Sequence, residues 1–333
     1  MSITRRIWII PNMNWNPSQV EDKIGIHFKH SQTLRLALIH PSYAKQIEEP
    51  EIDNQRLEFL GERILNLAIV DYLYHHFTHF SPNKLRALRD KLLESERLTK
   101  LWYDLQLGDT YPFLGLKEER HRLRLKAQNP FEKAFKALVG AIYTDRGFSQ
   151  TRNWLHKYLI TPLLERYLTD ILEPNPSIQH RELLGNVLLK AIVADYLNSQ
   201  ILYVNPSKLK PLWTKLVTKD SQAKYLTQLT TEDWEKIDVS PEELKQLKKS
   251  FKALLATIYL QCDRDNSKTS FRKTSKYFAE HFLDEDTIWQ QAIALLLKDG
   301  KSQKWIIHNV MGYPSKNYNQ GRERFYELMG KPE

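Results

Sequence analysis

Apolar residues recur at helical spacing along most of the chain, and residues 55–76 are the clearest case. The apolar positions there lie three or four residues apart, on one face of a helix: Leu57, Leu60, Ile64 and Leu67. Glu58 and Glu62 are four apart and share another face. Two carboxylates on a largely apolar helix need a partner, which is a divalent cation, a basic side chain or water at the edge of a cleft.

The same periodicity predicts further helices at about 18–30, 31–40, 82–106, 130–145, 149–172, 288–297, 302–311 and 317–329. Ser31 and Ser302 are expected N-caps, Pro130 lies in the first turn of its helix, and Gly147 follows the end of that helix. Glycine is scarce, at 11 residues. We therefore expect an all-α protein.

Four segments of the chain recur in the same order. Residues 181–185 are similar to 56–61, 195–197 to 71–73, and 205–209 to 81–85, the last two at an offset of 124 residues (195 − 71 = 124). Residues 251–259 are similar to 135–143 at an offset of 116 (251 − 135 = 116). This order predicts a tandem repeat of one helical domain, whose second copy is about eight residues shorter where the first has the charged segment 117–126.

These patterns divide the chain into an extension (1–17), a first domain (18–172), a linker with two prolines (173–177), a second domain (178–286) and a C-terminal helical module (287–333). The module has two short helices joined by a turn at Asp299–Gly300, which is typical of a helix-turn-helix. Its basic residues would contact phosphates: Lys301, Lys304, Lys316, Arg322 and Arg324. A packing appendage is the alternative.

Composition and charge limit the classes of partner that the protein is expected to bind. The net charge of +9 is spread along the chain, which favours a polyanionic partner and above all nucleic acid, although ordinary solubility charge is the alternative. The single cysteine, Cys262, excludes an intramolecular disulfide and a cysteine-rich zinc site. His75 and His79 are four apart, but we expect solvated histidines rather than a zinc site. No signal peptide and no apolar run long enough for a membrane span are visible, so we expect a cytoplasmic protein without a membrane partner.

Three segments, 37–44, 54–65 and 134–147, together resemble the ribonuclease III family. The resemblance covers about residues 18–170, and more faintly 178–283. It implies two helical endonuclease-like domains that pair through the 54–65 helix and form a valley for duplex RNA. Both copies lie in one chain, so we expect a monomer in which they form an intramolecular pseudo-dimer.

The resemblance also implies an Mg²⁺ site of four carboxylates. It places these on Glu58, where the family also has Glu, on Glu62, where Asp is usual, and on Lys133 and Lys136. In the second copy the matching residues are Glu182, Asn186, Lys249 and Lys252. Ammonium groups repel Mg²⁺ and neutralise carboxylates, so we expect remnant sites without metal or other cofactor, with Lys133 and Lys136 directed at Glu58 and Glu62. Glu132 is about 100° around the helix from Lys133 and is not expected to replace it.

The leading hypothesis is a catalytically degenerate protein that binds structured or double-stranded RNA in RNA processing or a ribonucleoprotein assembly. The expected RNA-binding residues are Lys84, Arg86, Arg89 and Lys91 in the first copy and Lys208, Lys210, Lys215 and Lys219 in the second. One alternative is an active Mg²⁺-dependent endoribonuclease, with Glu58 and Glu62 as metal ligands. The other is a DNA-binding or regulatory scaffold that uses the C-terminal module.

Overall fold

The computed structural model describes residues 16–49, 52–78, 80–108, 110–115, 130–164, 177–201, 204, 206–266 and 268–330. Within them the regular structure is helical, and the single β-bridge joins Ile39 to Phe113. The prediction of an all-α protein is confirmed. No described helix has the length and apolar character that a membrane crossing requires. The predicted extension, the charged segment 117–126 and most of the linker lie outside the described residues.

Two long helices form the centre of the first half. Helix α4 (Gln55–His76) has the predicted bounds, and α8 (Pro130–Leu155) crosses it. The crossing is possible only because glycines lie at the contact. A Cβ atom on Gly61 would lie 1.8 Å from the carbonyl oxygen of Lys136, and one on Gly140 would lie 2.2 Å from that of Leu57. The close approach brings the start of α8 beside Glu58.

The second half repeats this crossing with α10 (Ile178–Gln200) and α15 (Phe251–Asn266). A Cβ atom on Gly185 would lie 1.8 Å from the carbonyl oxygen of Lys252. Gly185 is 124 residues after Gly61, and Lys252 is 116 residues after Lys136. The two helix pairs therefore make the same backbone contact at the positions that the repeat relates.

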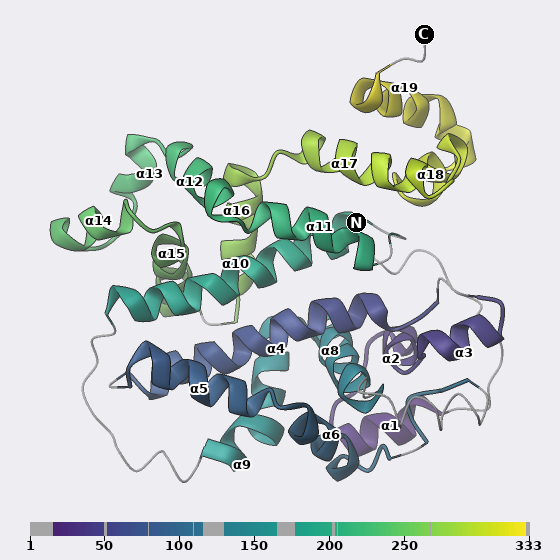
Figure 1. Cartoon of the computed structure of the whole chain (residues 1–333), viewed down its shortest axis with the longest axis horizontal. Coiled ribbons are helices and arrows are strands. Elements are labelled where there is room, and N and C mark those ends of the chain that lie inside the picture. Colours follow the sequence, from purple (N-terminus) through teal and green to yellow (C-terminus); the bar gives the residue numbers. More distant parts are fainter. Residues whose placement is uncertain are drawn as a thin grey trace.

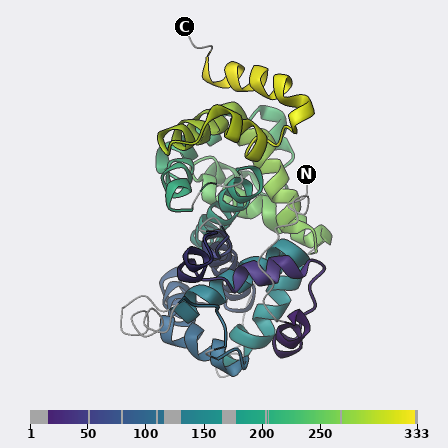
Figure 2. The ribbon, with the colours of Figure 1, turned by 90° about the vertical axis from the view of Figure 1, so that its right-hand side faces the viewer.

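Helices α4 and α10 lie antiparallel and side by side in the middle of the molecule, where they join the two halves (Figures 1 and 2). Arg56 at the start of α4 donates to the carbonyl oxygens of Asn198 (2.8 Å), Ile201 (2.9 Å) and Val204 (3.1 Å) at the end of α10. At the opposite end, His180 Nε2 donates to the carbonyl oxygen of Phe80 (2.7 Å). The contact is reciprocal, because His180 and Val204 are each 124 residues after Arg56 and Phe80.

A second reciprocal contact lies deeper between the halves. The hydroxyl of Tyr259 donates to Asp71 (3.1 Å), and that of Tyr143 donates to Asp195. Each pair joins one half to the other, and the two pairs occupy positions that the repeat relates. The halves thus face each other about an approximate twofold axis. The two pairs differ in one respect, because Asp71 also accepts from Arg152 (3.1 Å).

Shorter helices surround these four. In the first half they are α1 (Pro17–Ile24), α2 (Ser31–Ala37), α3 (Pro41–Gln46), α5 (Pro82–Leu92), α6 (Ser95–Asp104), the π-helix His156–Ile160 and α9 (Thr161–Leu164). In the second half they are α11 (Pro206–Leu216), α12 (Lys219–Thr227), α13 (Thr231–Glu235), α14 (Pro241–Leu247) and α16 (Ser270–Phe282). One apolar core runs through both halves.

The predicted helix end before Gly147 is confirmed, because Gly147 (φ +78°) is non-helical and separates two helical segments within α8, the second of which runs to Leu155. Two other helix predictions were wrong in detail. Residues 82–106 are two helices, because Glu94 leaves the helical conformation and its carbonyl accepts from the first turn of α6. Ser31 is the first residue of α2, and no side chain of the preceding residue caps this helix.

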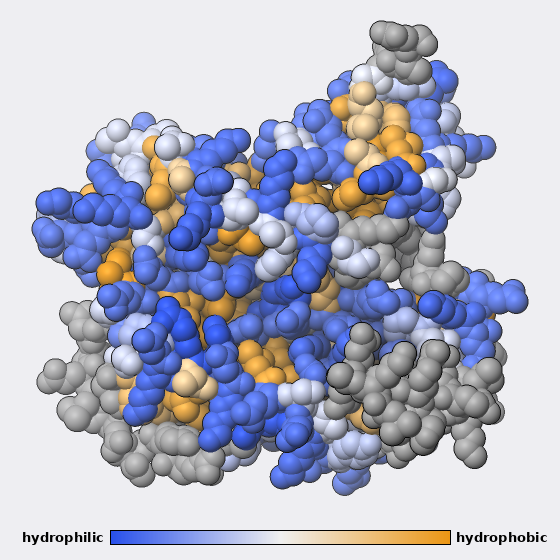
Figure 3. Space-filling model, viewed as in Figure 1, coloured by the Kyte–Doolittle hydropathy of each residue, from blue (hydrophilic) through white to orange (hydrophobic). Residues whose placement is uncertain are grey.

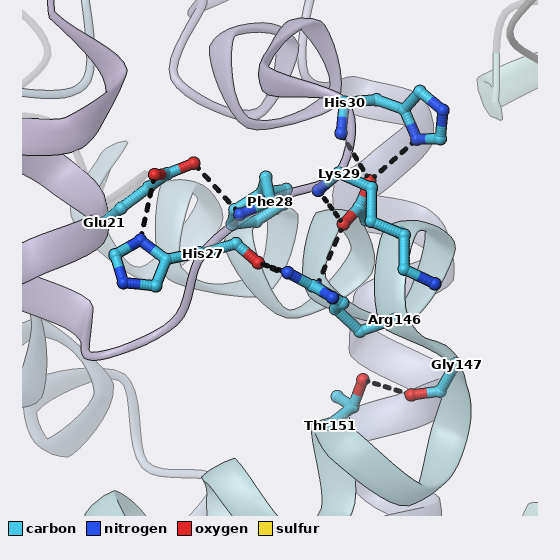
Figure 4. A network of polar contacts seen from close by, with 9 residues as sticks. Glu21, His27, Phe28, Lys29, His30, Arg146, Gly147 and Thr151 are labelled. Carbon is cyan, nitrogen blue, oxygen red and sulfur yellow. Dashed lines mark hydrogen bonds and ion pairs between the residues drawn. The ribbon is translucent and has the colours of Figure 1, made fainter.

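Asp145 instead fixes the chain in front of α2. Its buried carboxylate, near the kink of α8, accepts from the backbone N–H groups of Lys29 (2.7 Å) and His30 (2.9 Å). The adjacent Arg146 donates to the carbonyl oxygen of His27 (2.7 Å; Figure 4). These bonds tie α1 and α2 to α8, and through α8 to the crossing with α4.

The C-terminal module consists of α17 (Glu285–Lys298), α18 (Gln303–Asn309), the 3-10 turn Ser315–Asn317 and α19 (Tyr318–Met329). It begins two residues before the predicted boundary, with Asp284 as N-cap, and Ser302 caps α18 as predicted. Helix α17 packs on α11, and α18 and α19 project from the second half (Figure 1).

Candidate functional site

The first remnant site lies where α8 begins beside α4. Glu58 is half-buried on α4 and faces the start of α8. Burial raises the pKa of Glu58, although the charges of Lys133 and Lys136 act in the opposite direction. The lysines are therefore close enough to Glu58 to stabilise its charge, as the sequence predicted for that residue.

The ion pair of Lys136 is nevertheless made with another residue. Its ammonium group lies 2.5 Å from the carboxylate of Glu132, one helical turn earlier, and the hydroxyl of Ser95 on α6 donates to the same carboxylate. These two hydrogen bonds lower the pKa of Glu132 although burial opposes the change. From the sequence, Glu132 was not expected to take the position of Lys133 in the site. The structure places it within the cluster, where its charge also acts on Glu58.

Glu62 has a different cation from the one predicted. It pairs with Arg63, the next residue on α4. The guanidinium group of Arg63 lies over the ring of Phe59, 4.0 Å from its centroid, and 4.8 Å from the ring of Trp213 on α11. The sequence did not predict this pair, in which Glu62 is matched by a cation of its own helix.

This donor set does not fit Mg²⁺. The carboxylates of Glu58, Glu62 and Glu132 are matched by three cationic groups, those of Arg63, Lys133 and Lys136. A divalent ion needs carboxylates whose charge is not already matched, and two ammonium groups beside it would repel it. In the described part of the chain, no group of three or more His, Cys, Asp and Glu side chains is arranged to hold a metal ion. No catalytic step through a metal follows from this site.

The matching residues of the second half are still less acidic. Glu182 and Asn186 lie one turn apart on α10, and Lys252 lies in the first turn of α15. Lys249 precedes α15 and is exposed, so it does not share a helix with Lys252 as the repeat predicted. This second remnant site has one carboxylate and one nearby helical lysine.

The predicted RNA-binding residues divide into two groups. Six are exposed on the outer faces of α5, α11 and α12: Lys84, Arg86, Lys91, Lys210, Lys215 and Lys219. Arg89 instead is half-buried and lines a cavity between α4 and α10. The side chain of Lys208 lies outside the described residues, as does His79 of the zinc alternative. His75 bonds the carbonyl oxygen of Asp71 (2.7 Å).

Two basic residues that sequence reasoning missed, Arg63 and Lys190, line the same cavity as Arg89. A signal was present for Lys190. It follows Glu182 and Asn186 at intervals of four residues, so all three lie on one stripe of α10. The corresponding stripe on α4 is Glu58, Glu62 and Asn66.

Hydrophilic residues cover most of the described face seen in Figure 3, and hydrophobic residues are visible between the halves.

Comparison with known proteins agrees with the resemblance seen in the sequence. Residues 30–163 match a family model described as Ribonuclease-III-like. A protein named Ribonuclease 3 from Borreliella burgdorferi is 34% identical over 138 residues, which are 41% of this chain and 56% of that protein. Another from Pseudomonas paraeruginosa is 36% identical over 151 residues, 45% of this chain and 62% of that protein. The chain thus spans a little over half the length of these curated relatives.

A solved structure of the nuclease domain of ribonuclease III from Campylobacter jejuni has 30% sequence identity with this chain. It covers 44% of this chain and 97% of its own, with a TM-score of 0.39.

Proposed function

Since the chain belongs to the ribonuclease III family through residues 30–163, we propose that it binds double-stranded or structured RNA and does not cut it. The observation that carries the proposal is the ion-paired cluster of Glu58, Glu62 and Glu132. Each of these carboxylates faces a cation of the protein itself, so the cluster is neutral without a metal.

The proposal treats the second half as a diverged copy of the first. Support comes from the two reciprocal contacts, which join Arg56 to Val204 and His180 to Phe80, and from the matched glycine crossings. In this interpretation one chain supplies both halves of the valley that two family domains form. The protein then needs no second copy to bind a duplex.

Charge supplies the affinity. The remnant sites carry Lys133 and Lys136 at one end and Lys252 at the other, with Arg63, Arg89 and Lys190 between them. Cationic side chains along one surface bind the phosphates of a duplex regardless of its sequence, and the affinity then falls with salt. The ammonium groups supply the positive charge that metal ions would otherwise supply in this site. We place this binding in RNA processing or in a ribonucleoprotein assembly.

The test measures cleavage and binding on one duplex RNA, with Mg²⁺ and with a chelator. The expected result is intact RNA with Mg²⁺ and with the chelator, and RNA binding that persists in the chelator. Mg²⁺-dependent cutting that disappears in Glu58→Ala would overturn the proposal in favour of an active nuclease.

A charge-reversed variant tests whether the lysines bind RNA. Lys133→Asp combined with Lys136→Glu should weaken metal-independent binding by about tenfold or more, since two positive charges at the start of α8 are replaced by negative ones that repel phosphates. The matched control is Lys273→Asp with Lys276→Glu, because these residues are exposed on α16 and line no part of the cavity between the halves. Equal losses in both variants would show that net charge alone decides the affinity.

The C-terminal module is tested in the same assay with duplex DNA. Arg324 is occupied by ion pairs with Asp286 and Glu327, and the ammonium group of Lys301 lies over the ring of Trp305. Lys304 and Arg322 are exposed. Tight DNA binding that is lost in Lys304→Glu with Arg322→Glu would favour the DNA-binding alternative.

A further inference from the structure

A small cavity of about 120 Å³ lies between α4 and α10 and is also lined by residues of α5 and α11. Its eight lining residues form four pairs, each separated by 124 positions: Glu62 with Asn186, Arg63 with Val187, Asn66 with Lys190, and Arg89 with Trp213. The cavity is therefore on the approximate twofold axis. A group bound in it contacts both halves at once.

The two halves contribute different chemistry to this cavity. The first half supplies Glu62, Arg63, Asn66 and Arg89, and the second supplies one cation, Lys190. Arg63 is held by Glu62, and Arg89 by Asp90 (2.6 Å). Among the residues that the structure describes, Lys190 makes no ion pair. Its half-buried ammonium group is close to three other cations, those of Arg63, Arg89 and Lys252, and one carboxylate, that of Glu62, acts on it in the opposite direction. An anion is the ligand that relieves this crowding.

The cavity also holds an acceptor without a donor. The side-chain oxygen of Asn66 is buried and has no hydrogen-bond partner among the described residues. A buried carbonyl oxygen that accepts no hydrogen bond is destabilising. A ligand that fits must therefore bring a donor as well as a negative charge. A hydroxyl group beside a phosphate has this combination, and the backbone of RNA carries it at every nucleotide through the 2′-hydroxyl.

We propose that this cavity binds one phosphate of the RNA backbone together with an adjacent 2′-hydroxyl, with Lys190 and Arg89 on the phosphate and Asn66 on the hydroxyl. The cavity then distinguishes RNA from DNA at the centre of the valley. This inference rests on the proposed function and names the chemical group that the function selects.

The experiment uses the full chain and two duplexes of one sequence, ordinary RNA and RNA with 2′-fluoro groups, which keeps the A-form and lacks the hydroxyl donor. Wild-type protein should bind the ordinary duplex more tightly. Asn66→Leu should lower affinity for the ordinary duplex by about tenfold, the equivalent of one hydrogen bond to a buried group. It should leave affinity for the fluorinated duplex unchanged, so that the preference disappears.

Lys190→Met should weaken binding to both duplexes equally and lower the slope of log affinity against log salt by about one, because one phosphate contact is lost. The matched control is Lys273→Met on α16, which should leave binding and its salt slope as in wild type, and circular dichroism melts verify that every variant is folded. Inorganic phosphate is the second ligand tested, by its effect on the melting temperature.

The outcomes separate the two proposals. If wild-type protein binds duplex RNA but Asn66→Leu keeps the preference for the hydroxyl, the inference is overturned and the proposed function stands. If inorganic phosphate stabilises wild type and not Lys190→Met while duplex RNA binds both equally, the cavity is a site for a free anion, which also overturns the inference. If wild-type protein binds no RNA, the proposed function fails first.

Discussion

Replacing Asp195 by Asn should stabilise the protein at neutral pH, although the residue lies at the contact between the two halves. Burial raises the pKa of Asp195 to about 6, against an ordinary value of 3.8, and the hydrogen bond from Tyr143 offsets only part of this effect. The folded protein therefore disfavours the charged carboxylate. An Asn side chain presents a similar carbonyl oxygen to Tyr143 and has no charge to bury.

The size of the effect follows from the two pKa values. Because the folded-state pKa of Asp195 lies above the unfolded one, the folded state binds the proton more tightly. The contribution of Asp195 to the free energy of unfolding is then highest below about pH 4, falls as the pH rises toward 6, and is constant above that. The difference of about 2 pKa units corresponds to about 3 kcal/mol. Asp195→Asn should gain up to this amount at pH 7 and almost nothing at pH 4.

Urea unfolding at pH 4, 5, 6 and 7 measures this directly. Asp71→Asn is the matched control, since Asp71 occupies the related position but accepts from both Arg152 and Tyr259. It should destabilise the protein, by about 1 to 3 kcal/mol at neutral pH, because a hydrogen-bonded ion pair is lost. The reasoning is refuted if Asp195→Asn changes the unfolding free energy by the same amount at pH 4 and pH 7.

Three further substitutions test the contacts within and between the halves. Gly61→Ala places a methyl group 1.8 Å from the carbonyl oxygen of Lys136, so thermal unfolding should show a loss of stability of at least about 1 to 3 kcal/mol. An unchanged melting temperature would contradict the close approach of α4 and α8. Arg56→Met removes three hydrogen bonds to the end of α10 and should lower the unfolding free energy in urea by at least about 2 kcal/mol. Tyr143→Phe removes the hydrogen bond that lowers the pKa of Asp195, so its loss of stability should be larger at pH 7 than at pH 4; the reverse order would exclude this role.

Much of the fold was predictable because its main elements repeat. The bounds of α4 followed from the spacing of its apolar residues, and the structure reproduces them. The repeat offsets also indicated which residues correspond, and Arg56 and His180 make corresponding contacts. Pairing through the 54–65 helix came from the family resemblance, and α4 does pack on α10.

The choice of ion-pair partners was not predictable from spacing. The family resemblance places Lys136 near Glu58, but it does not show that Glu132 is held by Ser95 from α6 and competes for the same ammonium group. Arg63 was overlooked because neighbours along a helix normally point apart, whereas its long side chain reaches back to Glu62.

The cavity required the packing of both halves. Lys190 and Asn66 lie on different helices, and only the register of α4 against α10 brings them together. The break between α5 and α6 was equally hidden. Residues 82–106 have good helix formers on both sides of Glu94, so propensity alone does not predict the break that the structure has there.

The central claim is that the chain binds duplex RNA without a metal and leaves it intact. One measurement tests it most directly: binding and integrity of the same labelled duplex RNA, followed in parallel with Mg²⁺ and with a chelator, for wild type and Glu58→Ala. The account predicts full-length RNA in all four samples and binding that persists in the chelator. RNA fragments that form only with Mg²⁺ and wild-type protein would contradict it.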